Sequence, residues 1–122
     1  MSNTSLHTTQ HEWLQALADG SYAVGITDAG QEMLGDIVFC GDAQLGKILK
    51  AGETCAIVES VKAASDVHMP IDGVVIAFNT ELELDPTALN SAAYNTWIIK
   101  IKPAATADLS LLLSAASYQQ SL

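Results

Sequence analysis

The chain has 122 residues, 49% of them hydrophobic, and its 14 acidic residues face five lysines and no arginine, for a formal charge of −9. This length suits one domain over residues 1–122, and the composition excludes a disordered tail. An acidic surface repels phosphate backbones and anionic lipids, so nucleic acid and membranes are not expected as partners. No apolar run reaches the roughly 18 residues that a membrane helix needs. Residues 1–10 are expected to form a loose lead-in without the features of a targeting signal.

The cysteines and histidines carry no metal-site pattern. Cys40 and Cys55 both lie in apolar segments, where buried reduced thiols are the usual state in a small chain. The histidines share no ligand spacing with them, so no zinc site is predicted.

The first part of the chain alternates strand and turn signals. Residues 11–14 begin a strand, Asp19-Gly20 is a turn, and residues 22–26 return as a second strand that Gly25 weakens. A short helix is then predicted over residues 28–34, with Thr27 or Asp28 as its cap. Its further signals are the capping-box spacing of Asp28 and Gln31, the stop at Gly35, and a buried side of Ile26, Met33 and Leu34.

The middle of the chain is rich in strand signals. Branched and aromatic residues predict strands over residues 36–40, 54–60, 66–69, 74–78 and 96–102. Residues 62–65 are expected to form a compact turn, and residues 79–90 a surface loop.

A C-terminal helix is predicted over residues 106–117. Thr106 caps it, and one apolar face contains Leu109, Leu112, Leu113 and Ala116. Many short strands with glycine turns and two helices indicate a mainly β fold, either an antiparallel sandwich or a flattened barrel.

One lysine stands at a turn between two apolar strands. Lys62 has small neighbours, which leave its ammonium accessible, and the flanking strands fix its backbone. Glu59 and Asp66 stand on either side and give an acidic frame. These are the needs of a lysine that a modifying enzyme must reach, although most exposed lysines carry no such role.

The segment from Glu59 to Asp66, ESVKAASD, resembles the lipoylation motif of glycine cleavage H proteins. Biotin carriers place methionine on both sides of the lysine, where this chain has Val61 and Ala63. Lipoyl domains of 2-oxoacid dehydrogenases are shorter and usually have aspartate directly before the lysine. Four further segments resemble H-protein signatures in the family's order: His11–Trp13, Gly25–Asp28, Gln31–Phe39 and Trp97–Ile101.

This resemblance implies a hammerhead fold, or barrel-sandwich hybrid, of two small antiparallel sheets, with a lipoyl group on Lys62. It implies a non-catalytic carrier of lipoate, and no nucleophile–base set is visible in the sequence. The implied partners include glycine decarboxylase (P protein), which loads an aminomethyl group onto the arm, and aminomethyltransferase (T protein), which passes the one-carbon unit to tetrahydrofolate. Lipoamide dehydrogenase (L protein) reoxidises the arm. A lipoate ligase or lipoyl transferase attaches the lipoyl group. The implied location is the bacterial cytoplasm rather than the mitochondrial matrix.

The resemblance also implies roles for individual residues. By matching positions, Glu12 and Asp66 are the acidic residues of a cleft for the loaded arm, and Ile26 and Leu34 are its apolar lining. The frame that a ligase reads is Glu59, Val61, Ala63 and Asp66. Trp13 and Trp97 are expected in the core rather than against the arm.

The chain departs from the family pattern in one loop. Residues 92–97 lack the proline before Tyr94 and the glycine before Trp97 and are one residue shorter, so this loop is expected to take another path.

Two alternative functions stay open: a lipoyl donor that relays the arm to oxoacid dehydrogenases, and a paralogue whose lysine is never modified.

Overall fold

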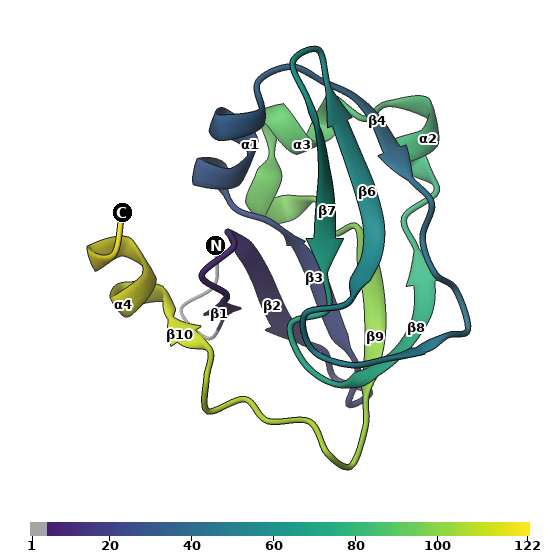
Figure 1. Cartoon of the computed structure of the whole chain (residues 1–122), viewed down its shortest axis with the longest axis vertical. Helices are drawn as coiled ribbons and strands as arrows, with labels where there is room; N and C mark the ends of the chain where they lie inside the picture. The colour runs from purple at the N-terminus through teal and green to yellow at the C-terminus, as the bar shows by residue number, and fades with distance from the viewer. Residues whose placement is uncertain (1–4) are drawn as a thin grey trace.

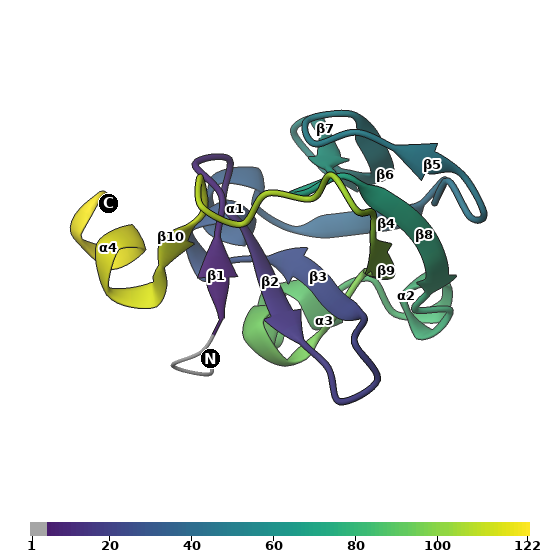
Figure 2. The same ribbon diagram turned by 90° about the horizontal axis from the view of Figure 1, so that it is seen from below.

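The computed structural model describes residues 5–122 and is mainly β, as predicted, with two antiparallel sheets packed face to face (Figures 1 and 2). In spatial order the larger sheet contains β10 (Leu113–Ser114), β1 (Leu6–His7), β2 (Glu12–Ala16), β3 (Tyr22–Ile26), β9 (Ile99–Pro103), β8 (Gly73–Phe78) and β5 (Ile48–Leu49). The smaller sheet contains β4 (Ile37–Gly41), β6 (Thr54–Ser60) and β7 (Ala64–His68).

One hydrophobic core fills the space between the sheets. Leu14, Val24 and Ile99 come from the larger sheet, and Val58 and Val67 come from the smaller one, all of them buried. The alternation of buried and exposed residues along β6 directs Val58 and Ser60 inward and Glu59 outward. The packing of this core therefore accounts for the inward direction of Ser60 and the outward direction of Glu59 beside the β6–β7 turn.

Gly25 has a packing role inside β3. It pairs with Trp13 across the β2–β3 ladder, and a Cβ at this glycine would lie 2.6 Å from the indole ring. The glycine therefore admits a close approach of Trp13, which is buried and donates its indole N–H to the carbonyl of Ala93. Ala93 belongs to a 3-10 turn, η1 (Ala93–Asn95), in the loop that departs from the family pattern.

The predicted short helix is confirmed with the same bounds as α1 (Asp28–Leu34). Thr27 is its cap and accepts a hydrogen bond from the N–H of Gly30, while Asp28 lies in the first turn, where the helix dipole favours an anion. The prediction that Met33 is buried is wrong, because its side chain is 67% exposed. Adjacent helical residues point about 100° apart, so a helix this short turns Leu34 toward the core and Met33 toward solvent.

The predicted surface loop over residues 79–90 contains two short helices, α2 (Glu81–Leu84) and α3 (Ala88–Ser91). Each buries one leucine, Leu82 and Leu89 respectively. One buried residue in a single turn leaves no periodic signal, which is why the sequence pattern predicted a loop.

The prediction of a C-terminal helix is correct in kind but wrong in extent, since α4 spans Ala115–Gln120. Residues 104–112 instead cross the molecule as an irregular connection, seen in Figures 1 and 2, to β10, which pairs with β1. The backbone hydrogen bonds of that pairing override the helical spacing of the leucines. Pairing also makes residues 6–7 a strand in place of a loose lead-in, and residues 1–4 lie outside the described residues.

The two cysteines offer a test of this core. Both are free and buried, and burial raises the pKa of each thiol to about 12. We expect neither to react with a disulfide reagent at pH 8 in the native state, and both to react in guanidinium, because the thiolate is the nucleophile. Absorbance of the released thiol measures this. Rapid stoichiometric reaction of either cysteine in the native protein would contradict the packing.

Candidate functional site

The turn between β6 and β7 is closed around the hydroxyl of Ser60. The last ladder pair is Glu59 with Ala64, so residues 60–63 make the turn and the strand begins two residues earlier than predicted. The backbone N–H of Ser60 donates to the carbonyl of Ala63 at 2.8 Å. The Ser60 hydroxyl oxygen accepts from the backbone N–H groups of Lys62 (3.2 Å) and Ala63 (3.1 Å). These bonds fix the backbone of Lys62.

A second contact ties this turn to the end of α1. The N–H of Val61 donates to the carbonyl of Asp36 at 3.0 Å, outside the β6–β7 ladder. Gly35 ends α1 with a φ of +82°, and a Cβ there would lie 3.0 Å from Cε of Lys62. Glycine is the residue that adopts this φ readily, and it leaves room for the lysine stem. Figure 1 shows α1 beside this end of the β6–β7 hairpin.

The lysine and its neighbours face solvent. Lys62 is exposed, and so are the four residues of the expected ligase frame, Glu59, Val61, Ala63 and Asp66. The strand alternation accounts for this at Glu59, which points away from the core. A modifying enzyme therefore has open access to the Lys62 amine.

A groove of about 270 Å³ begins at this hairpin. It brings together all four residues expected around a loaded arm, Glu12, Ile26, Leu34 and Asp66. The other lining residues are Gln10, His11, Gly30, Met33, Val58, Ala64, Ser65 and Val67. The groove thus has apolar walls, an acidic residue at the hairpin and a buried carboxylate.

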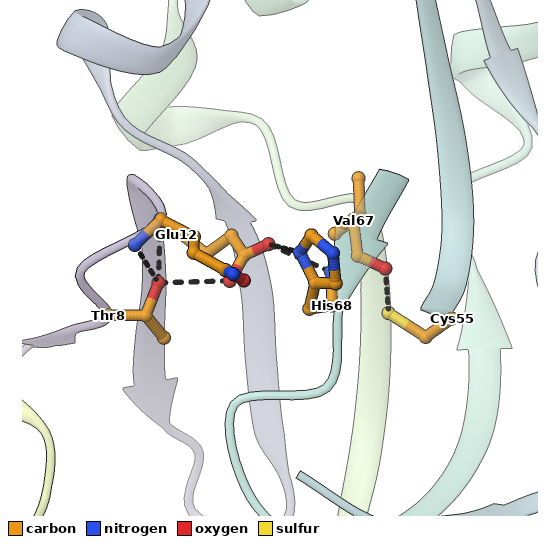
Figure 3. A network of polar contacts seen from close by, with 6 residues as sticks. Thr8, Glu12, Cys55, Val67 and His68 are labelled. Carbon is orange, nitrogen blue, oxygen red and sulfur yellow. Dashed lines mark hydrogen bonds and ion pairs between the residues drawn. The ribbon is translucent and has the colours of Figure 1, made fainter. Parts of the chain in front are cut away.

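The carboxylate of Glu12 bridges the two sheets. Its side chain is 3% exposed and lies at the start of β2. One oxygen accepts from the hydroxyl of Thr8 at 2.9 Å, and the other accepts from the backbone N–H of His68 at 2.8 Å and contacts the ring Nδ1 at 3.0 Å (Figure 3). Burial raises the pKa of this carboxyl group, while the hydrogen bonds from His68 and Thr8 oppose that rise.

Sequence reasoning missed three residues of this site. Ser60 is a common residue whose role depends on the turn, and His68 pairs with Glu12 from 56 positions away. His11 lines the groove and contacts the hydroxyl of Tyr118 in α4 at 2.7 Å. A serine two residues before the lysine was the one local signal available.

Other expected features lie away from the groove. Trp13 is buried in the core as predicted, whereas Trp97 is half-buried with the ammonium of Lys100 over its ring.

Within residues 5–122 no group of three or more His, Cys, Asp or Glu is arranged to hold a metal ion. In the same part of the chain, no helix is long and apolar enough to cross a membrane.

A two-sheet β domain with an exposed lysine on a hairpin defines the hammerhead class, to which biotinyl and lipoyl carriers belong. Residues 5–122 match the family model described as glycine cleavage H-protein. The chain is 58% identical over 113 residues to the glycine cleavage system H protein of Bordetella pertussis, covering 93% of this chain and 90% of that one. The corresponding protein of Thiobacillus denitrificans is 54% identical over 114 residues, covering 93% and 88%.

A solved structure gives the same result for the fold. The crystal structure of a glycine cleavage system H protein from Mycobacterium marinum superposes with a TM-score of 0.85 at 34% identity, over 100% of both chains. The chain therefore belongs to the glycine cleavage H-protein family, and the predicted hammerhead fold is confirmed.

The role of Ser60 is testable by removing its hydroxyl. We expect Ser60→Ala to lower the free energy of unfolding by about 1–2 kcal/mol, because it removes hydrogen bonds to two backbone N–H groups at a nearly buried position. Chemical denaturation measures this. Ser117→Ala, at an exposed helical serine, is the control and should change stability by less than about 0.5 kcal/mol. Equal effects of the two substitutions would contradict the role of Ser60.

Glu12 makes stability depend on pH. Because its pKa is raised in the folded state, its contribution is complete below the ordinary glutamate pKa and is lost as pH rises through the folded value. We expect the unfolding free energy of the native chain, relative to Glu12→Gln, to fall between pH 4 and pH 7. Urea unfolding of both proteins across this range measures the difference. A difference that rises with pH would show that the hydrogen bonds outweigh burial.

Proposed function

We propose that the chain is the lipoyl carrier of the glycine cleavage system, with lipoate joined as an amide to Nζ of Lys62. The observation that carries this proposal is the exposed Lys62 on a turn fixed by Ser60, in a chain of this family. The turn holds the backbone while the side chain stays free to meet an enzyme. Amide formation removes one positive charge and changes the formal charge from −9 to −10.

The lipoyl group supplies a disulfide that accepts the aminomethyl unit and electrons from glycine decarboxylation. The protein's own residues supply the tether and its surroundings. A tether of one side chain keeps its cargo at high effective concentration near each partner's site. Cys40 and Cys55 are kept out of exchange with the arm by burial and by their raised pKa values.

The groove is proposed as the resting place of the loaded arm. Its volume, about 270 Å³, lies just below the usual range for ligand pockets, which suits a narrow chain. Ile26 and Leu34 provide apolar contacts for the arm's methylenes. Glu12 and Asp66 provide negative charge for a cationic amine, and the charge of Glu12 acts in a partly dry site, where it is screened less.

The exposed frame of Glu59, Val61, Ala63 and Asp66 is proposed as the surface that a lipoate ligase or lipoyl transferase reads. It combines two carboxylates with two small apolar side chains next to the target amine. Such a surface fits a partner face with basic residues around an apolar centre.

The proposed partners are the P, T and L proteins of the glycine cleavage system. This rests on the family membership and on the names of the relatives. We place the protein in the bacterial cytoplasm, because the named relatives come from bacteria. The proposed role is non-catalytic: the chain carries the group, and the partner enzymes perform the chemistry.

Substitution of Lys62 tests the proposal. After expression with lipoate and a lipoate ligase, we expect Lys62→Arg to carry no lipoyl amide, to fold normally, and to acquire no glycine-derived methylamine with glycine decarboxylase, because arginine keeps the charge but cannot form the amide. Intact mass and thermal unfolding measure this. Lys47→Arg, at another exposed lysine, is the matched control and should be lipoylated and loaded.

Two outcomes would overturn the proposal. If the native chain is never lipoylated, it is an unmodified paralogue. If it is fully lipoylated yet takes no methylamine from glycine, it is a donor of lipoyl groups and not an aminomethyl carrier.

A further inference from the structure

Tyr118, near the end of the chain, contacts the groove region from beyond the two sheets. It belongs to α4, which follows β10 at the edge of the larger sheet (Figures 1 and 2). Although α4 is a short terminal helix, the side chain of Tyr118 is only 1% exposed. Its ring stacks on the ring of His7 in β1, with 4.5 Å between the ring centroids. This stacking fixes the position of the phenol hydroxyl.

The Tyr118 hydroxyl joins two segments that both line the groove. It lies 2.7 Å from Nδ1 of His11 and 2.7 Å from the hydroxyl of Thr27. Residues 10–12 line the groove from one segment, and α1, which Thr27 caps, lines it from the other. Burial raises the pKa of Tyr118, which keeps the phenol neutral. A neutral phenol can donate one hydrogen bond and accept another, so one hydroxyl serves both contacts.

His11 needs this support because its backbone is strained. Its φ is +67°, in the left-handed region that residues other than glycine rarely adopt. Such a conformation persists where the surrounding contacts determine it, and it is frequent at ligand-binding sites. The carbonyl of His11 accepts the N–H of Thr27 at 3.0 Å, while its ring contacts the Tyr118 hydroxyl. Separate contacts therefore hold the backbone and the side chain of His11.

The helix α1 approaches His11 closely at Gly30. A Cβ at this glycine would lie 3.1 Å from the carbonyl oxygen of His11 and 3.2 Å from its Cβ. Both residues line the groove. In packing this tight, a small displacement of His11 or of α1 changes the shape of the groove between them.

We propose that Tyr118 is a positioning residue for the loaded arm. Its hydroxyl joins His11 to the start of α1 and keeps these two parts of the groove at the separation that holds the arm. The inference rests on the proposed function, since it takes the groove as the resting place of the arm. The C-terminal helix thus shapes the groove, although no described residue of α4 is among those that line it.

Presentation of Lys62 does not depend on this contact. The turn that carries Lys62 is fixed by the Ser60 hydroxyl and by a bond to the end of α1, and neither includes Tyr118 or His11. Two properties of the protein should therefore separate. Attachment of lipoate needs only the turn, whereas retention of the loaded arm needs the groove. A general loss of structure would impair both properties together.

The test uses Tyr118→Phe, which keeps the ring on His7 and removes both hydroxyl contacts. The matched control is Tyr22→Phe, the same change in β3 at a position that does not line the groove. Each protein is lipoylated, and its arm is reduced with a phosphine. Formaldehyde and ammonium then condense with one thiol of the arm to give the aminomethyl thioether and water. Loading in this way does not require glycine decarboxylase, so failure of enzymatic loading bears on the proposed function and not on this inference.

Three measurements compare these proteins with the native chain. The rate of lipoylation by a lipoate ligase should be equal in all of them. The lifetime of the loaded arm, followed by intact mass after excess reagent is removed, should be about fivefold shorter in Tyr118→Phe, the lower end of typical coupling between two sites. NMR contacts between the arm and the methyl groups of Ile26 and Leu34 should weaken in the same variant. Tyr22→Phe should match the native chain in every measurement.

A second background shows whether Tyr118 acts through His11. Glycine adopts the positive φ of this position readily, and His11→Gly leaves no side chain for the hydroxyl to hold. In this background Tyr118→Phe should shorten the lifetime no further, because the contact that it removes is already gone. Unfolding curves establish that each variant is folded.

Several results would overturn the inference. One is a lifetime and a set of NMR contacts in Tyr118→Phe equal to those of the native chain. Another is an equal shortening of the lifetime by Tyr118→Phe in the native and His11→Gly backgrounds. A third is slower lipoylation of Tyr118→Phe, which would mark a general loss of structure. A native loaded arm without contacts to Ile26 or Leu34 would contradict the proposed groove itself, and this inference with it.

Discussion

The hydroxyl of Ser60 is the contact on which presentation of the lysine depends. It accepts the backbone N–H groups of two turn residues, and a third bond from Val61 to the carbonyl of Asp36 anchors the turn to the end of α1. The backbone of Lys62 is thereby held, while its side chain remains exposed. A carrier needs both properties. The modifying enzyme must find the amine in a defined place, and the arm attached there must then be free to move away from the protein surface.

The groove depends on a second contact that joins the two sheets. Glu12 begins β2 in the larger sheet and accepts hydrogen bonds from His68 at the end of β7 in the smaller one. Burial of a carboxylate with these partners costs less free energy than burial of one without them. Its charge then acts in a site of low dielectric. The same interaction therefore holds an acidic side chain in the lining of the groove, where it would attract a cationic guest.

Part of this arrangement could be read from the sequence, and the reasons are local. β6 and α1 have the predicted bounds, because strand content and helix caps are encoded within a few residues. The exposure of Lys62 at its turn is likewise predicted by its small immediate neighbours. The contact of His68 with Glu12 spans 56 positions, and nothing near either residue encodes it. The start of α4 differs from the predicted one for a similar reason, because β10 pairs with β1 across almost the whole chain. Short sequence patterns reflect interactions between residues close in the chain, whereas these contacts join residues that only tertiary packing brings together.

The central claim is that one lysine among five is built to be acylated. Peptide mapping by tandem mass spectrometry, after lipoylation of the folded native chain, tests it most directly. We expect one lipoyl amide per chain, on Lys62, with Lys47, Lys50, Lys100 and Lys102 unmodified, because only Lys62 combines exposure with a turn fixed by Ser60 among the described residues. A lipoyl amide on another lysine, or its spread over several of them, would contradict the account.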